Sequence, residues 1–344
     1  MIYSDSYWEN AEKAIFSVDG LEELKNRSIL ITGASGMVCS AIIELLFFLN
    51  NRFNYNISLY LAGRSYERIN KRFMNIGKYE YVYFDALKEW KYSHSIDYLI
   101  HGASNANPQL YDERPIETII ENIIGTKSVL EFAKQHNCRR VLYISSSEVY
   151  GQNKEKNHLY CEEDYGYIDI LNPRSCYPNG KRAAETLCAS YNKEYDLNSV
   201  IVRLGHVYGP TITESDTRAS AQFLRNAAAG KDILMKSDGH QLRSYIFTMD
   251  CAAAIIEVLL NGEKNEAYNI SSKSSVISIR KLAEIIAGYA SVSIQYANPS
   301  DKELRSYNMM DCSALNSDKL ERLGWKSCFN VYDGVRCAID ALKG

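Results

Sequence analysis

Two residues with complementary chemistry, Tyr177 and Lys181, stand four positions apart at the start of a segment with helical periodicity. That spacing stacks both side chains on one face of a helix. A tyrosine phenol has an ordinary pKa of about 10, and a neighbouring ammonium group favours its ionised form. Tyr177 could then remove a proton from a hydroxyl group. By itself the spacing is common and is more often structural, so its meaning depends on the motifs around it.

A strand end rich in hydroxyl groups comes shortly before this pair. Residues 141–145 form an apolar run that continues into Ser146, Ser147 and Glu148. Open parallel sheets bind their ligands at the carboxyl ends of the strands. We therefore expect these polar side chains to lie in a ligand site.

A glycine turn near the N-terminus is suited to bind a pyrophosphate. Gly33 and Gly36 follow the first apolar run, at residues 29–32, and lead into a helix expected at 40–49. The glycines permit a tight turn and a close approach of phosphate to the positive helix N-terminus. The third motif position holds Cys39 instead of glycine, which is still a small side chain. A glycine motif between a strand and a helix favours a dinucleotide site, with an ordinary strand-to-helix turn as the alternative.

The end of the second apolar run bears on which dinucleotide would bind. NAD-specific sites usually carry an acid there to hold the adenosine ribose hydroxyls, but this chain has Gly63 and Arg64. Arg64 could meet a 2'-phosphate, which favours NADP slightly, although an arginine stacked on adenine or left in solvent is nearly as well supported. The cofactor is therefore expected to be NAD or NADP.

The order of the predicted elements indicates an α/β fold. Short apolar runs alternate with amphipathic segments from residue 28, at residues 29–32, 57–62, 81–84, 98–100, 141–145 and 199–204. This alternation predicts a Rossmann doubly wound parallel sheet covered by helices on both faces. Beyond residue 206 the strand signals become sparse, which indicates a smaller, mostly C-terminal lobe.

Three parts are expected along the chain. They are an appended N-terminal helix at 1–27, a Rossmann dinucleotide-binding domain at 28–206 with a later contribution near 243–262, and a substrate-binding lobe at 207–242 and 263–344.

Composition excludes several classes of protein. The 344 residues are 46% hydrophobic, which is enough for a substantial core, and the net charge of -3 offers no basic surface for nucleic acid or anionic membrane. The nine cysteines include no CxxC pair or His-Cys cluster, so we expect no metal site and a reducing cytoplasmic environment. No signal peptide or membrane-spanning stretch is apparent in the sequence.

Taken together, these motifs resemble the extended short-chain dehydrogenase/reductase family of nucleotide-sugar epimerases, dehydratases and decarboxylases, from about residue 28 to the end. Segments 97–104, 122–126 and 203–210 resemble three further motifs of that family. Within it, the stretches 103–108, 146–151, 173–177 and 180–182, which include Tyr177 and Lys181, are most similar to UDP-glucuronate decarboxylases.

The resemblance implies a role for individual residues. Ser146, Tyr177 and Lys181 would be the catalytic hydroxyl, the base and the ribose-binding lysine, and Glu148 would assist at the sugar. Asp85 would contact adenine, and Ala103 would lie beside the cofactor. The full set of implied cofactor-binding residues is Gly33, Ser35, Gly36, Met37, Val38, Arg64, Asp85, Ala86, Ala103, Ser104, Asn122, Tyr177 and Lys181. The resemblance also implies five substrate-binding residues. Arg243 would bind the diphosphate, Arg174 would hold a carboxylate, and His206 stands where many relatives carry an asparagine. The other two are Asn105 and Ser147.

The resemblance also implies a reaction that begins with hydride removal from C4 of a nucleotide sugar. UDP-glucuronate decarboxylation is the first reading, with 4-epimerase, 4,6-dehydratase and NADPH-dependent 4-ketoreductase as alternatives, and a non-catalytic cofactor-sensing protein as a less favoured one. Dehydratases typically carry an Asp-Glu pair where this chain has Ser147 and Glu148. Departures from the decarboxylase pattern are Gly63-Arg64, Pro178-Asn179 and Asn105.

Relatives in this family commonly form dimers through two helices. Here they would be the segments around residues 115–135 and 177–195. The expected partners are therefore a nucleotide sugar and a second copy of the chain, with no nucleic acid or membrane.

Overall fold

The computed structural model describes residues 3–88, 90, 92–153, 155, 158–300, 304 and 310–343 of the chain. The helices are α1 (Asp5–Ile15), α2 (Met37–Phe53), α3 (Tyr66–Phe73), α4 (Pro108–Glu113), α5 (Pro115–Gln135), α6 (Cys176–Tyr195), α7 (Ala219–Ala228), α8 (Thr248–Asn261), α9 (Ile279–Ala290), α11 (Asp318–Arg322) and α12 (Val331–Leu342). Short 3-10 helices are η1 (Leu21–Leu24), η2 (Ser147–Tyr150), η3 (Pro173–Ser175) and η4 (Lys273–Ser275).

The strands are β1 (Ser28–Thr32), β2 (Ser58–Gly63), β3 (Glu80–Tyr83), β4 (Tyr98–His101), β5 (Arg140–Ser146), β6 (Ser199–Leu204), β7 (His206–Tyr208), β8 (Ile233–Met235), β9 (Leu242–Phe247), β10 (Ala267–Ile270), β11 (Val276–Ser278), β12 (Ile294–Tyr296) and β13 (Cys312–Ser313). Seven of them form the main sheet in the order β3-β2-β1-β4-β5-β6-β10, with every neighbouring pair parallel. The predicted doubly wound parallel sheet is confirmed.

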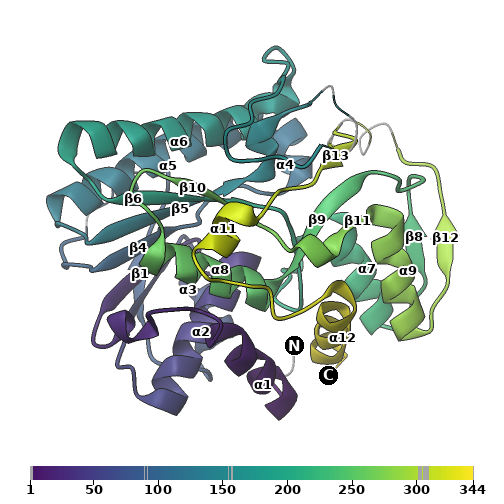
Figure 1. The fold of residues 1–344 in the computed structure, drawn as a ribbon, viewed down its shortest axis with the longest axis horizontal. Coiled ribbons are helices and arrows are strands. Elements are labelled where there is room, and N and C mark those ends of the chain that lie inside the picture. The colour runs from purple at the N-terminus through teal and green to yellow at the C-terminus, as the bar shows by residue number, and fades with distance from the viewer. Residues whose placement is uncertain are drawn as a thin grey trace.

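Helices cover both faces of this sheet, with α5 and α6 on one side and α2 and α8 on the other (Figure 1). Side chains of β1 alternate between the two layers, as the pleat of a strand requires. Ile29 and Ile31 pack on the side of α2 and α8, while Leu30 packs on the side of α5 and α6. Burial on both faces explains the continuous apolar runs by which these strands were recognised.

The second lobe is built around β9, which pairs with β7, β11 and β13. Helices α7, α9 and α12 pack together beside this sheet and the short β8–β12 pair (Figure 1). Two segments depart from the expected division of the chain. Strand β10 lies in the range expected for the lobe but forms the edge of the main sheet, because its backbone pairs with β6. Strand β9 belongs to the second sheet, and in the range 243–262 it is α8 that packs on the main sheet.

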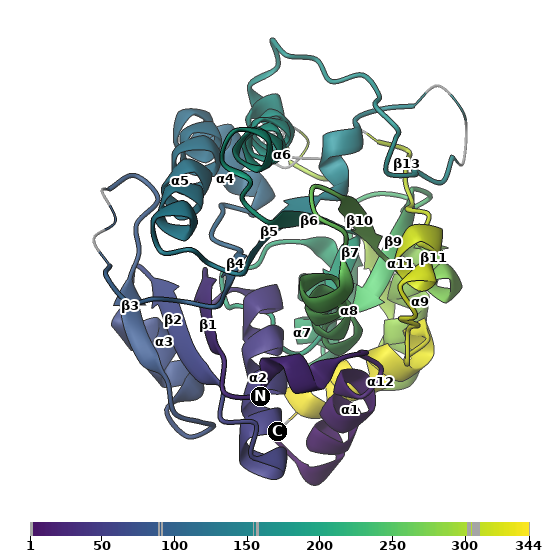
Figure 2. The same ribbon diagram turned by 60° about the vertical axis from the view of Figure 1, so that its left-hand side comes forward.

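The N-terminal segment is helical as expected and packs on the main domain through α2 and α8. Glu44 of α2 is buried and receives hydrogen bonds from Tyr3 at 2.8 Å, from Tyr7, and from Arg72 at 3.0 Å. The two ends of the chain lie close together (Figure 2). Helix α1 also contacts the segment before α12, where Lys13 stands over the ring of Phe329 at 4.7 Å.

All nine cysteines carry free thiols. Within the described ranges, no group of three or more histidine, cysteine or carboxylate side chains is arranged to hold a metal ion. A search of the same residues finds no helix with the length and apolar character needed to span a bilayer.

Candidate active site

The glycine turn after β1 has the shape that a dinucleotide requires. Gly33 adopts a φ of +72°, and a Cβ there would stand 2.8 Å from the backbone of Gly102 and Ala103. Gly36 donates its N–H to the carbonyl of Gly33 at 2.9 Å and caps the N-terminus of α2. A long helix therefore points its positive end at a turn in which two residues carry no side chain, which fits a bound pyrophosphate.

Cys39 occupies the third position of the glycine motif. Its side chain fits because Gly102, the residue that follows β4, has no side chain of its own. Its Sγ lies 3.6 Å from the carbonyl oxygen of Thr32, and a Cβ on Gly102 would stand only 2.4 Å from the same sulfur. Helix α2 can therefore pack closely on the sheet, because the position facing Cys39 is a glycine, Gly102. Burial raises the pKa of the Cys39 thiol to about 12, so the thiol stays neutral.

The predicted catalytic residues meet at the carboxyl edge of the main sheet. Ser146 ends β5, and Tyr177 and Lys181 occupy the first turns of α6 on the same face. The Tyr177 ring stacks on Tyr111 with 4.5 Å between centroids, which fixes its plane. Lys181 donates from Nζ to the carbonyl oxygen of Ile144 at 2.8 Å.

Burial moves both titratable groups toward their neutral forms. The pKa of Lys181 falls to about 7 because of desolvation, with Glu185 opposing. The pKa of Tyr177 rises to about 12, first through burial and then through Glu148, while Ser146, Arg218 and Tyr111 act in the opposite direction. The surrounding side chains alone therefore leave the phenol protonated near neutral pH.

Glu148 and Arg174 form a bidentate ion pair near the N-terminus of α6. The guanidinium nitrogens lie 2.6 and 3.0 Å from the two carboxylate oxygens, and the guanidinium stands 5.1 Å from the centre of the Tyr111 ring. The sequence suggested separate tasks for these residues, at the sugar and at a carboxylate. In the structure each compensates the charge of the other, so they face the site as one unit.

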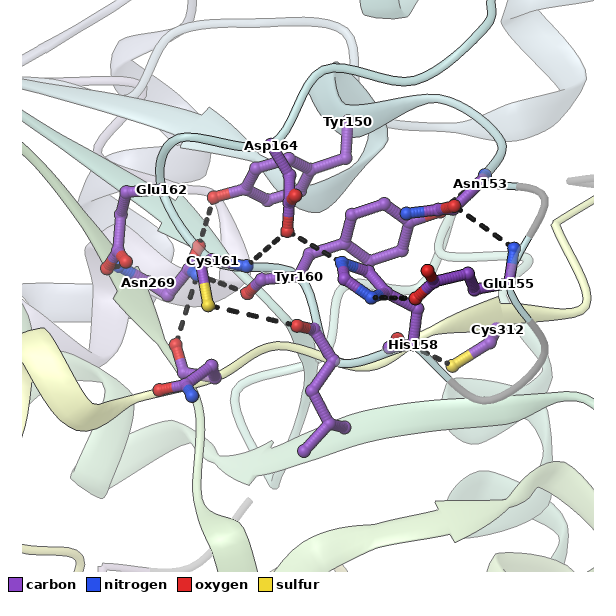
Figure 3. Close-up of polar contacts among 12 residues, drawn as sticks. Tyr150, Asn153, Glu155, His158, Tyr160, Cys161, Glu162, Asp164, Asn269 and Cys312 are labelled. Atoms are coloured by element: carbon purple, nitrogen blue, oxygen red, sulfur yellow. Dashed lines mark hydrogen bonds and ion pairs between the residues drawn. The ribbon is translucent and has the colours of Figure 1, made fainter.

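The loop after β5 is tied to both lobes by polar contacts (Figure 3). Tyr150 donates to the side-chain oxygen of Asn269 at 2.6 Å, and Asn269 donates to the carbonyl of Tyr160 at 2.8 Å. Farther along, Asp164 contacts His158 Nε2 at 2.7 Å, and Cys312 of β13 donates to the carbonyl of His158 at 3.3 Å. These contacts hold the turn that carries Glu148.

The second lobe contributes a basic wall opposite Tyr177. Arg243 comes from β9 and donates to the carbonyl of Leu242 at 2.9 Å, and His206 comes from the neighbouring β7. The pKa of His206 lies well below its usual range because of burial and the charges of Arg243 and Arg218, so the imidazole is neutral. Its Nδ1 is buried without a hydrogen-bond partner among the described residues.

Arg218 is a member of this wall that the sequence reading missed. It is held by Asp216, with Nε at 3.0 and 3.2 Å from the two carboxylate oxygens. Arg218 is the N-cap residue of α7, where the helix dipole disfavours a positive charge. A basic residue directly before a predicted helix was the signal that could have identified it.

One cavity of about 440 Å³ joins the two halves of the site. Of the predicted site residues, it is lined by Gly33, Gly36, Met37, Val38, Ser104, Ser146, Ser147, Glu148, Arg174, Tyr177, Lys181, His206 and Arg243. The cavity wall does not include Ser35, Arg64, Asp85, Ala86, Ala103, Asn105 or Asn122.

Most of these remaining residues gather around α5. Ser104 donates to Asn122 at 3.0 Å, and a Cβ on Gly125 would stand 2.8 Å from Ala86. Arg64 extends from the end of β2 to Glu121, with 3.4 Å between Nη1 and Oε1. This second group forms the neighbourhood in which the sequence placed adenosine, and Glu121 is an acid in it that the sequence reading did not single out.

Comparison with known families identifies the chain. Residues 29–271 match the model of the NAD dependent epimerase/dehydratase family. The chain belongs to this family.

Relatives with assigned names lie within the same group. The chain is 26% identical over 322 residues to UDP-glucuronic acid decarboxylase 1 of Xenopus tropicalis, covering 93% of this chain and 73% of that protein. It is 28% identical over 316 residues to UDP-glucuronic acid decarboxylase 3 of Arabidopsis thaliana, covering 90% and 87%. The predicted resemblance to decarboxylases is confirmed at the level of sequence similarity.

Solved structures share the fold of this NAD-dependent epimerase/dehydratase family member. UDP-glucose 4-epimerase from Thermotoga maritima has a TM-score of 0.73 at 19% identity, covering 91% of this chain and 98% of that one. A dTDP-glucose 4,6-dehydratase from Bacillus anthracis, in complex with NAD, has a TM-score of 0.74 at 20% identity, covering 92% and 96%.

Gly33→Ala tests the dinucleotide turn. The new methyl group would collide with backbone at 2.8 Å and force a positive φ on alanine. We expect at least tenfold weaker NAD binding and a loss of roughly 1–3 kcal/mol in the free energy of unfolding. Titration calorimetry and chemical denaturation measure these quantities.

Gly288→Ala is the matched control, because Gly288 lies in α9 and an added Cβ there would meet no described atom within 4 Å beyond its own stretch of helix. It should leave NAD binding unchanged and alter stability by no more than about 1 kcal/mol. Wild-type NAD affinity in the Gly33→Ala variant would show that the turn does not hold the dinucleotide.

Proposed function

We propose that this protein oxidises C4 of a nucleotide sugar with a bound nicotinamide dinucleotide and that its reaction is decarboxylation of UDP-glucuronate. The observation that carries the proposal is the shared cavity, in which Ser146, Tyr177 and Lys181 face Arg218 and Arg243. Chemistry at a hydroxyl and recognition of an anion are thereby brought within reach of one ligand.

The charge of the cavity wall suits an acidic nucleotide sugar. Its basic side chains are Arg174, Lys181, Lys236, Arg218 and Arg243, and its carboxylate is Glu148, counted over the described residues. A diphosphate and a uronate carboxylate together supply several negative charges, which such a wall would attract and orient.

Each residue of the first wall has a proposed task. Tyr177 removes the proton of the C4 hydroxyl, and the Ser146 hydroxyl holds the same oxygen in place. Lys181 binds the ribose of the cofactor and stabilises the phenolate once it forms. The bound dinucleotide supplies the hydride acceptor and later the hydride donor.

Decarboxylation then follows from the position of the new ketone. A C4 ketone is β to the C6 carboxylate of a glucuronate, so carbon dioxide leaves readily and the electron pair of the broken C5–C6 bond passes to an enolate. The enolate takes up a proton from solvent at C5, and return of the hydride to C4 completes the pentose. We assign the departing carboxylate to Arg218, because its guanidinium lines the same cavity as Tyr177. The Glu148–Arg174 pair would then bind the sugar hydroxyls as a unit.

The other sugar reactions differ in what they need from the cavity. Dehydration across C5 and C6 needs an acid and a base, but Ser147 stands where dehydratases typically have an aspartate, and Glu148 is held by Arg174. Epimerisation and ketone reduction need no further carboxylate, and they remain the alternative enzymatic readings. The Ser146, Tyr177 and Lys181 set favours an enzyme over a cofactor sensor.

For the cofactor, we propose NAD over NADP. Arg64 alone favoured NADP in the sequence, but its charge is compensated by Glu121, whose side chain is buried. The same carboxylate would repel a 2'-phosphate and could accept a hydrogen bond from a ribose hydroxyl.

We also propose a homodimer formed through α5 and α6. Ile116, Ile120 and Ile124 recur every four residues and place an exposed apolar stripe on α5, which packs along α6. On the outer side of α6, Thr186 and Ser190 bond to carbonyls of their own helix, which leaves a surface that a second copy can approach closely.

The decarboxylase proposal predicts a defined product. Purified protein with NAD and UDP-glucuronate should yield carbon dioxide and a UDP-pentose, identified by mass spectrometry. Tyr177→Phe should lose about 10²- to 10⁴-fold in turnover because the base is missing, yet keep NAD affinity.

Other products would redirect the assignment. UDP-galacturonate without carbon dioxide would indicate an epimerase, and NADPH consumption with a 4-keto sugar would indicate a reductase. Binding of NAD with no turnover of any nucleotide sugar would favour the sensor.

Glu121→Gln tests the cofactor proposal. Wild-type protein should bind NAD more tightly than NADP, and removal of the carboxylate should free Arg64 and improve relative NADP affinity by roughly fivefold. Glu117→Gln, on the same helix but paired with Arg114, should leave the ratio unchanged. A wild-type preference for NADP would overturn the proposal.

Ile120→Glu tests the dimer. Light scattering should give twice the chain mass for wild type and the single-chain mass for the variant, because the charge would be buried in the interface. Tyr332→Glu, at an exposed position of α12, serves as control and should remain dimeric. Wild-type protein that stays monomeric at micromolar concentration contradicts the proposal.

A further inference from the structure

Residues 211–218, which we call the strap, follow β7 and cross the main sheet at the point where its strand order reverses. The chain runs from β1 outward through β2 to β3, and then returns to place β4 on the other side of β1. Open parallel sheets bind ligands in the crevice at such a switch point. Gly33 after β1 and Gly102 after β4 both line the cavity. The strap contacts the chain on both sides of this crevice.

On the β1 side, the strap is fixed to the dinucleotide turn. Thr211 is fully buried and donates from Oγ1 to the carbonyl oxygen of Met37 at 2.8 Å. Arg218, at the other end of the strap, donates from Nη2 to Sδ of the same methionine at 3.5 Å. Met37 begins α2 and lines the cavity. This end of the strap is therefore anchored beside the turn that we assign to the pyrophosphate.

On the β4 side, the contact is a clasp centred on Asn107. Its Nδ2 donates to the carbonyl oxygen of Ser215 at 3.2 Å, and its Oδ1 accepts from Oγ1 of Thr217 at 2.9 Å. The same Oδ1 accepts from the N–H of Gln109 at 3.1 Å and so caps α4. Residues next to the clasp on both segments line the cavity. Separation of the two segments at Asn107 would therefore open the cavity wall.

The strap itself is held by polar contacts and buries little apolar surface. Each of residues 212–217 is at least partly exposed, and the side chain of Glu214 is 98% exposed. Arg225 of α7 donates to the carbonyl oxygens of Thr213, at 2.9 Å, and Asp216, which fixes the strap on the side of the second lobe. A segment of this kind opens at lower cost than a packed helix or strand. The clasp is thus the contact that an opening motion away from α4 would break.

We propose that Asn107 clasps the strap over the crevice and thereby retains a bound dinucleotide between turnovers. The inference rests on the proposed function, in which one dinucleotide accepts a hydride from C4 of the sugar and later returns it. A cofactor that left before the return would carry the hydride away and leave a ketone on the sugar. Closure of the crevice by the strap prevents that loss.

The closed strap also keeps the basic wall in place. Asp216, which holds Arg218 through its Nε at 3.0 and 3.2 Å, is part of the strap. Arg218 lines the cavity on the side opposite Tyr177. One closure therefore retains the cofactor and fixes an arginine that we assign to the substrate.

The release rate of NAD tests the clasp without turnover. Protein loaded with labelled NAD is mixed with an excess of unlabelled NAD, and the label that stays on the protein is followed over time. Asn107→Ser should release NAD about tenfold faster, because serine still caps α4 but is too short to bond to Ser215 and Thr217. Thr217→Val, which keeps the shape of the side chain and leaves the cap intact, should release it about fivefold faster.

A second measurement follows the strap itself. Amide hydrogen exchange across residues 212–217, recorded on the full chain without nucleotide, should be faster in both variants than in wild type. Glu214→Gln is the matched control, because its exposed side chain lies on the same strap outside the clasp, and it should change neither exchange nor NAD release. The double variant of Asn107→Ser with Thr217→Val should release NAD within about twofold of Asn107→Ser, since both changes break the same contact.

Unchanged NAD release in the folded Asn107→Ser and Thr217→Val variants overturns the proposal, even where hydrogen exchange is faster. An equal acceleration in Glu214→Gln, or multiplied effects in the double variant, would also overturn it. A role for Asn107 limited to the cap of α4 would leave Thr217→Val unchanged in both measurements. Failure to convert UDP-glucuronate would count against the decarboxylase proposal alone, because neither measurement uses a nucleotide sugar.

Discussion

The parallel pairing of β1, β4 and β5 is the constraint on which the site depends. Thr32 is in register with His101, and His101 with Tyr143, so the three strands reach the same edge together. The glycine turn and Gly102 follow β1 and β4 directly, and Ser146 lies three residues farther along β5, so all of them line the cavity at this edge. Helix α6 then needs only to pack on β5 and β6 for Tyr177 and Lys181 to join them.

Charged side chains can be buried at this edge of the sheet because most of them are paired with a group of opposite charge. Each of three arginines at or near the cavity has a carboxylate partner, in the pairs Arg174–Glu148, Arg218–Asp216 and Arg64–Glu121. Arg243 differs, because its guanidinium donates hydrogen bonds to the backbone carbonyls of Leu242 and Asp311. Its charge is therefore the least compensated in the basic wall and the best suited to a ligand anion.

The sequence was sufficient for the fold and for the residues that a local pattern reveals. Buried strands appear as apolar runs, and a Tyr-x-x-x-Lys spacing fixes two side chains on one helical face, so both were predictable. The pairing of charged side chains could not be predicted from the sequence. Arg64 and Glu121 are 57 positions apart, and Glu148 and Arg174 are 26 apart, so only the folded chain shows that each pair meets.

The same limit explains the misplaced strand β10. Four residues, Ala267–Ile270, are too short to give a period, and their membership of the main sheet depends on pairing with β6. Asn269 on this strand bonds to Tyr150, so the edge strand also braces the turn that carries Glu148.

Holding Lys181 in a dry site is costly for stability. Burial lowers the pKa of Lys181 from 10.5 to about 7, so the charged form is disfavoured in this site. Helix α8 offsets costs of this kind, because its residues from Thr248 to Leu259 are all buried between the sheet, α2 and the second lobe. The apolar layer beneath one face of the sheet thus supports uncommon protonation states at its edge.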